Sequence, residues 1–431
     1  MNRKASSCEL AVFLADKSVD MQLLMCYNLF NFKQDTLNMK TDKLFEDKKM
    51  NQRLHAEIER LQQKYISIWE DVCNIESQTN DKIGVDKVGE YFIALSKHNG
   101  WDVEILEQPV AGNVICITMN KDANGAPVTF SGHIDTVHPK GLFGFPAVKK
   151  DDEKIYGPGV VDCKGGVVAG FLTMEALANI GFRSRPVRML LQSDEEMGSK
   201  PSNKDTIKYI CKKAKDSIAF FNLEGHNNGD ACIGRKGIIT FEFTIYGKAA
   251  HSSACAKQGA SAILDAAYKI IELEKLKDDK GLTCNCGIVS GGTVKNTVPS
   301  KCVFTADVRY ATKEQFYWVC DYARQVASMV HVEGCRCELA IFSGRPAMER
   351  TEKNLRLFEK MNEIYVANGM SELKERNRNA GSDAAEVTQA GIPCVECMGV
   401  RGGEMHSIGE FAYLDSLVES AKRLGTVTLY I

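Results

Sequence analysis

Apolar residues recur at the spacing of an α-helix in two segments that begin near residue 50. The segment MNQRLHAEIERLQQKYISIWEDVCNI, residues 50–75, has apolar side chains every three or four positions, and GVDKVGEYFIALSKHNG repeats the pattern up to Gly100. This spacing predicts two amphipathic helices, and the glycine ends the second. Residues 1–49 show no such period. We therefore expect them to form an N-terminal extension outside the main fold, of unknown role.

Short apolar runs alternate with a helical segment from about residue 103 onward. The runs VEILEQP, NVICITM, VTFSGHIDTV, VRMLLQS and IAFFNLEG predict strands, and GGVVAGFLTMEALANIG predicts a helix. This order is typical of an α/β fold with a mainly parallel mixed sheet flanked by helices. In such sheets the ligand crevice lies at the carboxyl ends of the strands. The polar sequences HID, SDEE and LEG fall at these ends.

A different order of elements occupies residues 233–345. The segments GIITFEFTIYG, LTCNCGIVSGG, KCVFTADVRY and CRCELAIF predict strands, and two longer segments with helical spacing lie between them. The order β-α-β-β-α-β is that of a ferredoxin-like unit. We therefore expect an α+β insertion that interrupts the α/β domain. The predicted parts are the extension (1–49), the first part of the α/β domain (50–232), the insertion (233–345) and the second part of the α/β domain (346–431).

Composition and charge argue against several classes of protein. The net charge of −2 gives no electrostatic reason to expect nucleic acid as a partner. No run reaches the roughly 18 apolar residues of a membrane span, and Glu9 and Asp16 interrupt the apolar N-terminal stretch that would otherwise resemble a signal peptide. The 16 cysteines are scattered, which suits reduced thiols, and the C-x-x-C pair of Cys394 and Cys397 is weak evidence for a zinc or redox site. We expect a cytoplasmic protein without a membrane partner.

Side chains that can bind metal ions gather at the predicted strand ends and in one late loop. Each one alone has an ordinary explanation as a helix cap, turn residue or hydrogen-bonded histidine. Taken together, two imidazoles and several carboxylates without a thiolate make a site suited to zinc, cobalt or manganese. These side chains are His133, Asp135, Asp162, Glu195, Glu196, Glu224 and His406.

Two local patterns suggest how these groups divide their roles. In a strand through His133 and Asp135, alternation would place both side chains on one side, so that the carboxylate holds the second nitrogen of the imidazole. The adjacent side chains of Glu195 and Glu196 point apart, so one can bind metal while the other acts as a base. We expect the preceding Asp194 to cap or support the turn.

The motifs as a set resemble those of a known family. H-I-D-T-V, G-P-G-V-V-D-x-K-G-G, D-E-E-x-G-S, the Glu of NLEG, G-x-x-A-H-S and G-G-x-x-H-S occur in order over residues 52–431. They are similar to the co-catalytic zinc peptidases of metallopeptidase family M20. This family includes aminoacylases, glutamate carboxypeptidases, succinyl-diaminopimelate desuccinylases, acetylornithine deacetylases and tripeptide aminopeptidases.

The resemblance implies two zinc ions, with cobalt or manganese as alternatives. One ion would be held by His133 and Glu224, the other by Glu196 and His406, and Asp162 would bridge them. It further implies that Glu195 is the general base, that Asp135 orients His133, and that the peptide bond between Asp162 and Cys163 is cis.

For the insertion, the resemblance implies a lid that also forms a homodimer. His251 would stabilise the oxyanion from the partner subunit, Asn296 would bind substrate, and Arg309 would bind the substrate carboxylate through two parallel hydrogen bonds. Gly381 would contact the substrate. Hinges near 233 and 345 would let the insertion close over the substrate. Each residue taken alone has an ordinary explanation. His251 would then be a surface residue beside a helix, and Arg309 would belong to a cross-strand salt bridge.

The function implied is zinc-dependent hydrolysis of an amide or peptide bond next to a free carboxylate, through a metal-bridging hydroxide. The substrate would be a peptide or an N-acyl amino acid, cleaved by a carboxypeptidase-like exopeptidase or an N-acyl-amino-acid hydrolase. Tripeptide aminopeptidase or deacylase activity is the enzymatic alternative. A non-catalytic binding protein on the same scaffold is the alternative from another class, because a fold alone does not establish chemistry.

Overall fold

The computed structural model describes residues 48–227, 229–279, 281–376 and 381–431. Nearly all of the predicted N-terminal extension lies outside the described residues. Residues 1–56 and 57–431 form two units. Residues 48–56 of the first unit are helical, and so are residues 57–74 of the second. The following paragraphs concern residues 57–431.

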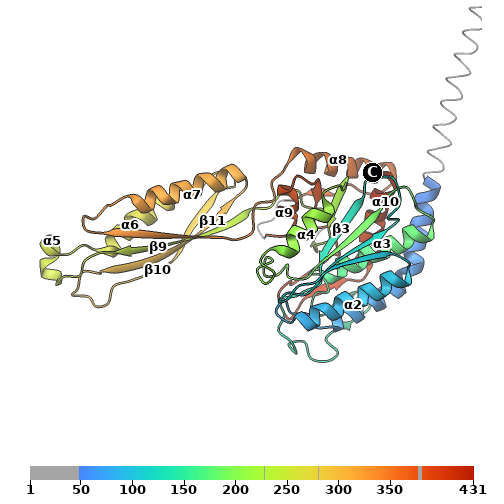
Figure 1. Cartoon of the computed structure of the whole chain (residues 1–431), viewed down its shortest axis with the longest axis horizontal. Coiled ribbons are helices and arrows are strands. Elements are labelled where there is room, and N and C mark those ends of the chain that lie inside the picture. Colours follow the sequence, from blue (N-terminus) through green and yellow to red (C-terminus); the bar gives the residue numbers. More distant parts are fainter. Residues whose placement is uncertain (1–47, 228, 280, 377–380) are drawn as a thin grey trace, which may run out of the picture. The chain divides into compact units, whose positions relative to one another are not determined.

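The larger sheet has six strands in the order β1-β2-β6-β3-β7-β14 (Figure 1). The strands β6, β3, β7 and β14 run parallel, whereas β1 and β2 form antiparallel pairs at one edge. Every residue of β2, β3 and β7 is buried, as expected of strands covered on both faces. The predicted mainly parallel mixed sheet is thus confirmed. The strands are β1 (Asp102–Leu106), β2 (Val114–Met119), β3 (Val128–His133), β6 (Val187–Gln192), β7 (Ala219–Asn222) and β14 (Cys394–Val395).

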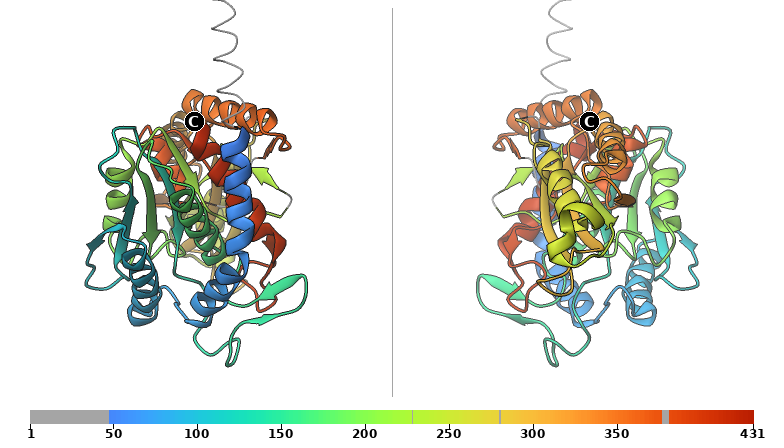
Figure 2. Two further views of the ribbon diagram at one scale, coloured as in Figure 1. Left: turned by 90° about the vertical axis from the view of Figure 1, so that its right-hand side faces the viewer. Right: turned by 90° about the vertical axis from the view of Figure 1, so that its left-hand side faces the viewer.

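Helices cover both faces of this sheet (Figure 2). On one face, Gly170 of α3 leaves room for the side chain of Met189 from β6. On the other face, Leu190 and Phe220 pack with buried residues of α4 and α9. No helix among the described residues combines the length and the apolar character needed to cross a membrane. The helices are α2 (Lys82–His98), α3 (Lys164–Asn179), α4 (Asp205–Ala214), α8 (Glu352–Ala367), α9 (Ala384–Gln389) and α10 (Asp415–Tyr430).

A second sheet has four antiparallel strands in the order β10-β11-β9-β12, which is the ferredoxin-like order. Buried and half-buried residues alternate along β9 and β11, because only one face of the sheet packs against helices. Phe243 and Phe304 stack on this face with ring centroids 4.7 Å apart. The boundaries at 233 and 345 and the role as a lid stay predictions. The elements are β9 (Gly237–Tyr246), η1 (Ser252–Ala254), α5 (Cys255–Gln258), α6 (Ala262–Leu273), β10 (Thr283–Gly291), β11 (Lys301–Tyr310), α7 (Lys313–Ser328) and β12 (Arg336–Ser343).

A small four-stranded sheet, in the order β15-β16-β5-β4, was not predicted. Its strands are two or three residues long, which is too short to show a period in the sequence. This sheet supports the loop that carries His406, between β15 and β16. Its strands are β4 (Lys149–Lys150), β5 (Lys154–Tyr156), β15 (Gly402–Gly403) and β16 (Phe411–Tyr413), and a separate parallel pair joins β8 (Asp230–Ala231) to β13 (Lys374–Glu375).

Candidate metal centre

The predicted strand-end side chains converge at one edge of the six-stranded sheet. His133 is the last residue of β3, and Glu224 follows the end of β7 by two positions. Glu195 and Glu196 lie in the turn after β6, and Asp162 lies just before α3. Since β3, β6 and β7 are parallel neighbours, their carboxyl ends meet at one edge. The topology therefore brings together residues that are up to 91 positions apart in the chain, from His133 to Glu224.

The loop between β15 and β16 brings His406 to the same edge. Its Nε2 lies 3.1 Å from Oδ2 of Asp162 and 3.2 Å from Oε2 of Glu196. His406 has a φ of 64°, a conformation that residues other than glycine adopt rarely. The position of this imidazole thus depends on how the surrounding loop is held.

Asp162 lies between the two imidazoles. Its Oδ1 is 3.1 Å from Nε2 of His133, and its Oδ2 faces His406 on the other side. Oε1 of Glu224 is 3.7 Å from the same His133 nitrogen. Ligand atoms around one tetrahedral zinc ion, at bond lengths of about 2.0–2.2 Å, are separated by roughly 3.3 Å. The spacing of these groups therefore fits two metal ions, one on each side of the Asp162 carboxylate.

Charge in the cluster also fits a cation. Hydrogen bonds to Asp162 and Glu196 raise the pKa of His406 to about 10. Burial opposes the charged form of Asp162, but hydrogen bonds from His133 and His406 hold its pKa well below the usual range. Burial, together with the Asp162 charge, raises the pKa of Glu224 to about 8. Three carboxylates face two imidazoles here, and bound divalent cations would replace the protons that hold these groups together in their absence.

Asp135 contacts both His133 and the turn after β6. β3 ends at His133, and Ile134 still donates to the backbone oxygen of Gln192 in β6 at 2.9 Å. Nδ1 of His133 lies 3.0 Å from the backbone oxygen of Asp135 and 3.4 Å from its carboxylate. The carboxylate also accepts hydrogen bonds from the backbone N–H groups of Glu195 and Glu196, both at 3.2 Å, and from the Thr79 hydroxyl at 2.7 Å. Asp135 therefore also holds the turn that carries the two glutamates.

The three consecutive acids after β6 have three different environments. Asp194 accepts hydrogen bonds from the Thr206 hydroxyl at 2.7 Å and the backbone N–H of Ser202 at 3.0 Å. The prediction that it supports the turn is confirmed. Glu196 faces His406, whereas Oε1 of Glu195 lies 2.6 Å from Nη2 of Arg345. The repulsion expected among three acids is thus relieved by separate partners.

Sequence reasoning missed Arg345, which follows β12. Besides its ion pair with Glu195, it donates to the backbone oxygen of Glu195 and lies 2.6 Å from Oδ1 of Asp383. Burial raises the pKa of Glu195 well above its usual value, while the Arg345 charge opposes this shift. Burial and the Arg345 guanidinium therefore act on the pKa of this carboxyl in opposite directions. An arginine between a strand and a proline gave no signal of this contact.

The predicted substrate-binding residues divide into two groups. Arg309 lines a cavity of about 480 Å³ together with Asp162, Glu195, Glu196, Glu224 and His406. It also pairs with Asp307 on its own strand, with Nε 2.7 Å from Oδ1. Gly381 lines the same cavity, against the side chain of Arg345.

The other two predicted residues lie together in the insertion. His251 is exposed, and its Nδ1 lies 2.8 Å from the Ser253 hydroxyl. The backbone oxygen of Asn296 accepts a hydrogen bond from the N–H of Ser252 at 3.0 Å. Within the part of the chain that the structure describes, no recorded hydrogen bond or ion pair joins either residue to the metal-capable cluster.

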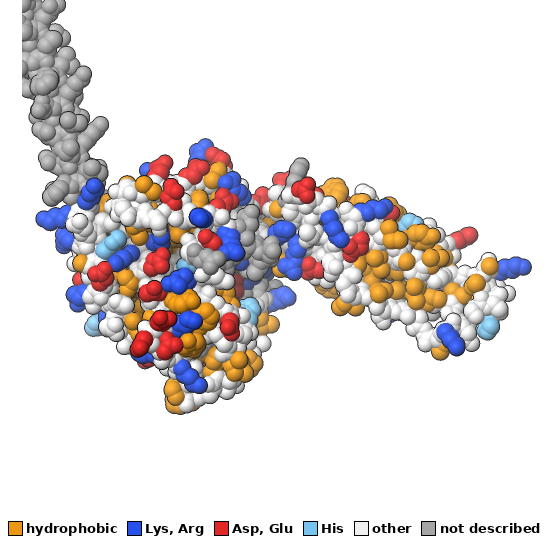
Figure 3. All heavy atoms as spheres, turned by 180° about the vertical axis from the view of Figure 1, so that it is seen from behind, with side chains coloured by type: hydrophobic (Ala, Val, Ile, Leu, Met, Phe, Trp, Pro, Cys, Tyr) orange, Lys and Arg blue, Asp and Glu red, His pale blue; other side chains and the backbone are white. Residues whose placement is uncertain are grey.

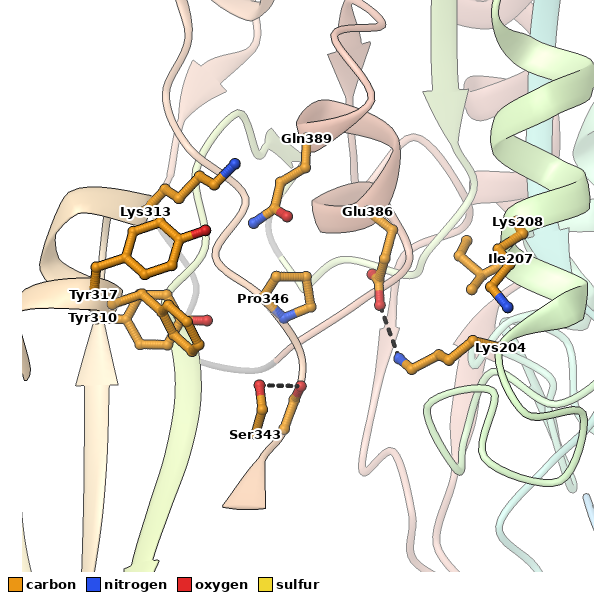
Figure 4. Close-up of a pocket in the computed structure, with 12 residues that line it drawn as sticks. Lys204, Ile207, Lys208, Tyr310, Lys313, Tyr317, Ser343, Pro346, Glu386 and Gln389 are labelled. Carbon is orange, nitrogen blue, oxygen red and sulfur yellow. Dashed lines mark hydrogen bonds and ion pairs between the residues drawn. The ribbon is translucent and has the colours of Figure 1, made fainter. Parts of the chain in front are cut away.

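A second cavity, of about 410 Å³, lies beside α4 and α9 (Figure 4). Lys204 and Glu386 form an ion pair of 3.1 Å in its wall, and Tyr310 and Tyr317 line the opposite side. None of its lining residues belongs to the predicted ligand set. The cavity lined by the acids is therefore the candidate site.

Cys163, which follows Asp162, is buried, and the peptide bond from Asp162 to Cys163 is cis, as the resemblance implied. Its thiol donates to the backbone oxygen of Leu223 at 3.4 Å. In the C-x-x-C pair of Cys394 and Cys397, the thiol of Cys397 lies 3.8 Å from Nη2 of Arg235. Among the described residues, neither Cys394 nor Cys397 belongs to a group with metal-ligand spacing.

The fold and the cluster together define an α/β protein that can hold metal ions at the carboxyl edge of its sheet. The model of peptidase family M20/M25/M40 matches residues 129–429, and the chain therefore belongs to this family of metallopeptidases. This confirms the family predicted from the motifs.

Carboxypeptidase G2 from Pseudomonas sp. (strain RS-16) is 29% identical over 347 residues, which are 79% of this chain and 83% of the relative. Succinyl-diaminopimelate desuccinylase from Wolbachia pipientis wMel is 29% identical over 250 residues, 52% of this chain and 60% of that protein. Among solved structures, aminopeptidase PepT from Bacillus cereus ATCC 10987 superposes with a TM-score of 0.73 at 19% identity, covering 85% of this chain and 98% of that one. The structural likeness supports the fold, and the activities after which these relatives are named differ.

Proposed function

We propose that the chain is a di-zinc amidohydrolase that cleaves an amide or peptide bond next to a free carboxylate. The observation that carries this proposal is the Asp162 carboxylate, whose two oxygens each face one imidazole at 3.1 Å. His133 and Glu224 would hold one ion, and His406 and Glu196 the other. Cobalt or manganese would fit the same nitrogen and oxygen ligands.

When bound, the two ions would supply Lewis-acid activation of the carbonyl and of a water molecule. The side chains of this protein do the remaining work. Glu195 lines the cavity beside the ligand set, where its carboxylate would accept a proton from the attacking water and return it to the leaving amine. Arg345 contacts Glu195 and so limits the positions available to this carboxylate.

Arg309 supports a substrate with a free carboxylate. Its guanidinium lines the acidic cavity, and it is one third exposed, so a ligand can reach it. A planar guanidinium binds a carboxylate through two parallel hydrogen bonds. The relative named carboxypeptidase G2 agrees with this substrate class. Tripeptide aminopeptidase and deacylase activity remain the alternatives, in view of the relatives named aminopeptidase and desuccinylase.

The carboxylate requirement gives a direct test of substrate class. We expect a panel of dipeptides and N-acyl amino acids to be cleaved only when the terminal carboxyl is free, and amidation of that carboxyl to raise KM. Replacing Arg309 by methionine should raise KM for the free acid by about 10- to 100-fold, because a hydrogen bond to a charged group contributes about 1.5–3 kcal/mol. The kcat should change little.

Arg336→Met is the matched control, because Arg336 is an exposed arginine of the same sheet that pairs with Glu338. Steady-state kinetics on both variants check the prediction. If substrates with a blocked amino end were rejected and carboxamides were accepted, the aminopeptidase alternative would replace the proposal.

The predicted homodimer is also part of the proposal, since His251 would act from a partner subunit. Hydrophobic side chains gather on the surface of the insertion (Figure 3). Ile271 of α6 and Ile288 of the edge strand β10 are 57% and 67% exposed. Exposed apolar patches and open strand edges are typical of protein interfaces.

We expect a double Ile271→Glu, Ile288→Glu variant to convert a dimer into monomers in light scattering, with reduced activity. Val366→Glu, at a similarly exposed apolar position on α8, is the control and should leave the mass unchanged. A wild-type protein that is monomeric at micromolar concentration would contradict the dimer. A cytoplasmic location stays a prediction from the sequence.

A further inference from the structure

Glu410 is a buried carboxylate outside the ligand set. It is 1% exposed and lies four residues after His406 in the same loop. Its Oε1 accepts hydrogen bonds from the backbone N–H groups of Val161 at 3.0 Å and Asp162 at 3.1 Å. Its Oε2 lies 2.7 Å from Nε2 of His138. A charge is costly to bury without partners, and here three donors surround it.

These bonds join three separate segments, each of which carries a predicted metal ligand. Val161 and Asp162 belong to the segment before α3, and His138 belongs to the loop that follows His133. Glu410 itself belongs to the His406 loop, and its backbone oxygen accepts a further bond from Gly157 at 3.2 Å. One carboxylate thus sets the distance between the Asp162 backbone and the loop that presents His406.

The two predicted ion sites depend on this carboxylate to different extents. His133 and Glu224 are attached to β3 and β7, which are central strands bound to neighbours on both sides. His406 has no such support, because its loop connects strands of two and three residues and its side chain is 57% exposed. Loss of Glu410 would therefore free His406 from Asp162 and leave His133 and Glu224 in place.

We propose that Glu410, held by His138, is a positioning residue that assembles the ion site formed by Asp162, Glu196 and His406. It acts through the backbone of Asp162 and through the His406 loop, and it does not touch the substrate. The inference rests on the proposed two-metal function. Residues that support metal ligands typically contribute 10- to 100-fold in metal affinity.

The test is a titration of the metal-free full-length protein with Co²⁺, followed by calorimetry and by the visible absorption of bound cobalt. Wild type should bind two ions in two steps. In Glu410→Ala, the weaker step should lose 10- to 100-fold in affinity, and the tighter step should stay within about threefold. Glu410→Gln should retain most of the second site, because its amide oxygen can still accept from both backbone N–H groups.

Two controls separate positioning from a general loss of structure. Glu175→Gln alters another buried carboxylate, one that is bonded to Lys64 and Tyr65, and should leave both steps unchanged. The unfolding temperature and circular dichroism of the metal-free variants report on the fold. If Glu410→Ala does not fold, His138→Ala carries the test, with a smaller loss expected at the same step.

The outcomes are distinct. If Glu410→Ala weakens both cobalt-binding steps equally, or leaves both unchanged, the proposed positioning role is overturned. A wild-type protein that binds fewer than two ions overturns the two-metal function itself, whatever Glu410 does. Loss of the second step alone, with rescue by glutamine, supports the inference.

Discussion

Replacing Glu195 by glutamine is expected to lower kcat by about a thousandfold without changing the metal content. The amide has nearly the same size as the carboxylate but cannot accept the proton of the attacking water, and general acid–base catalysis typically contributes about 10²- to 10⁴-fold. Glu195 is not in the predicted ligand set, and its carboxylate faces Arg345. Steady-state kinetics and elemental analysis on the same preparation measure both quantities.

Asp383→Asn is a suitable control for this experiment. Asp383 is another carboxylate bound to Arg345, at 2.6 Å, so the control separates loss of the base from disturbance of the arginine. We expect it to lower kcat far less than Glu195→Gln. A Glu195→Gln variant as active as wild type would leave the non-catalytic binding protein as the better interpretation.

Replacing Asp162 by asparagine is expected to abolish activity and to reduce the bound metal to one ion or none. The asparagine side chain has only one oxygen, whereas the carboxylate directs one oxygen toward His133 and the other toward His406. The amide also removes the negative charge that lies between the two predicted ions. A bridging ligand affects both sites at once, so the loss of metal should exceed that in Glu410→Ala.

Equilibrium dialysis against zinc, followed by elemental analysis, measures this loss. Asp205→Asn, on an exposed carboxylate at the start of α4, is the control and should retain wild-type metal content. Two ions bound to Asp162→Asn with unchanged affinity would show that the carboxylate does not bridge them, and the assignment of ligands would need revision.

The sequence predicted the mainly parallel mixed sheet because most of its elements carry local patterns. The buried strand β2 is apolar along most of its length, and α3 follows a glycine-rich turn. The metal-capable side chains at the strand ends were predictable for the same reason, because the sequences HID and SDEE lie where apolar runs end. The small sheet under His406 was not, because strands as short as Gly402–Gly403 contain no period.

The folded site contains contacts that the sequence did not predict. Asp135 was expected to hold the imidazole of His133, and its carboxylate lies 3.4 Å from Nδ1 of that ring. The same carboxylate also accepts hydrogen bonds from the backbone of Glu195 and Glu196. These contacts join segments 60 or more positions apart, so no local pattern in the sequence predicted them.

The sequence by itself determined the family, the α/β class and the types of side chain at the strand ends. Only the tertiary structure decided which partners these side chains have. Arg345 meets Glu195 across 150 residues, and Glu410 meets the backbone of Asp162 across 248. Neighbours in the chain determine local conformation through periodicity and turn chemistry, which are legible in the sequence. Contacts over such separations arise when packed strands and loops meet, and no short pattern of residues encodes them.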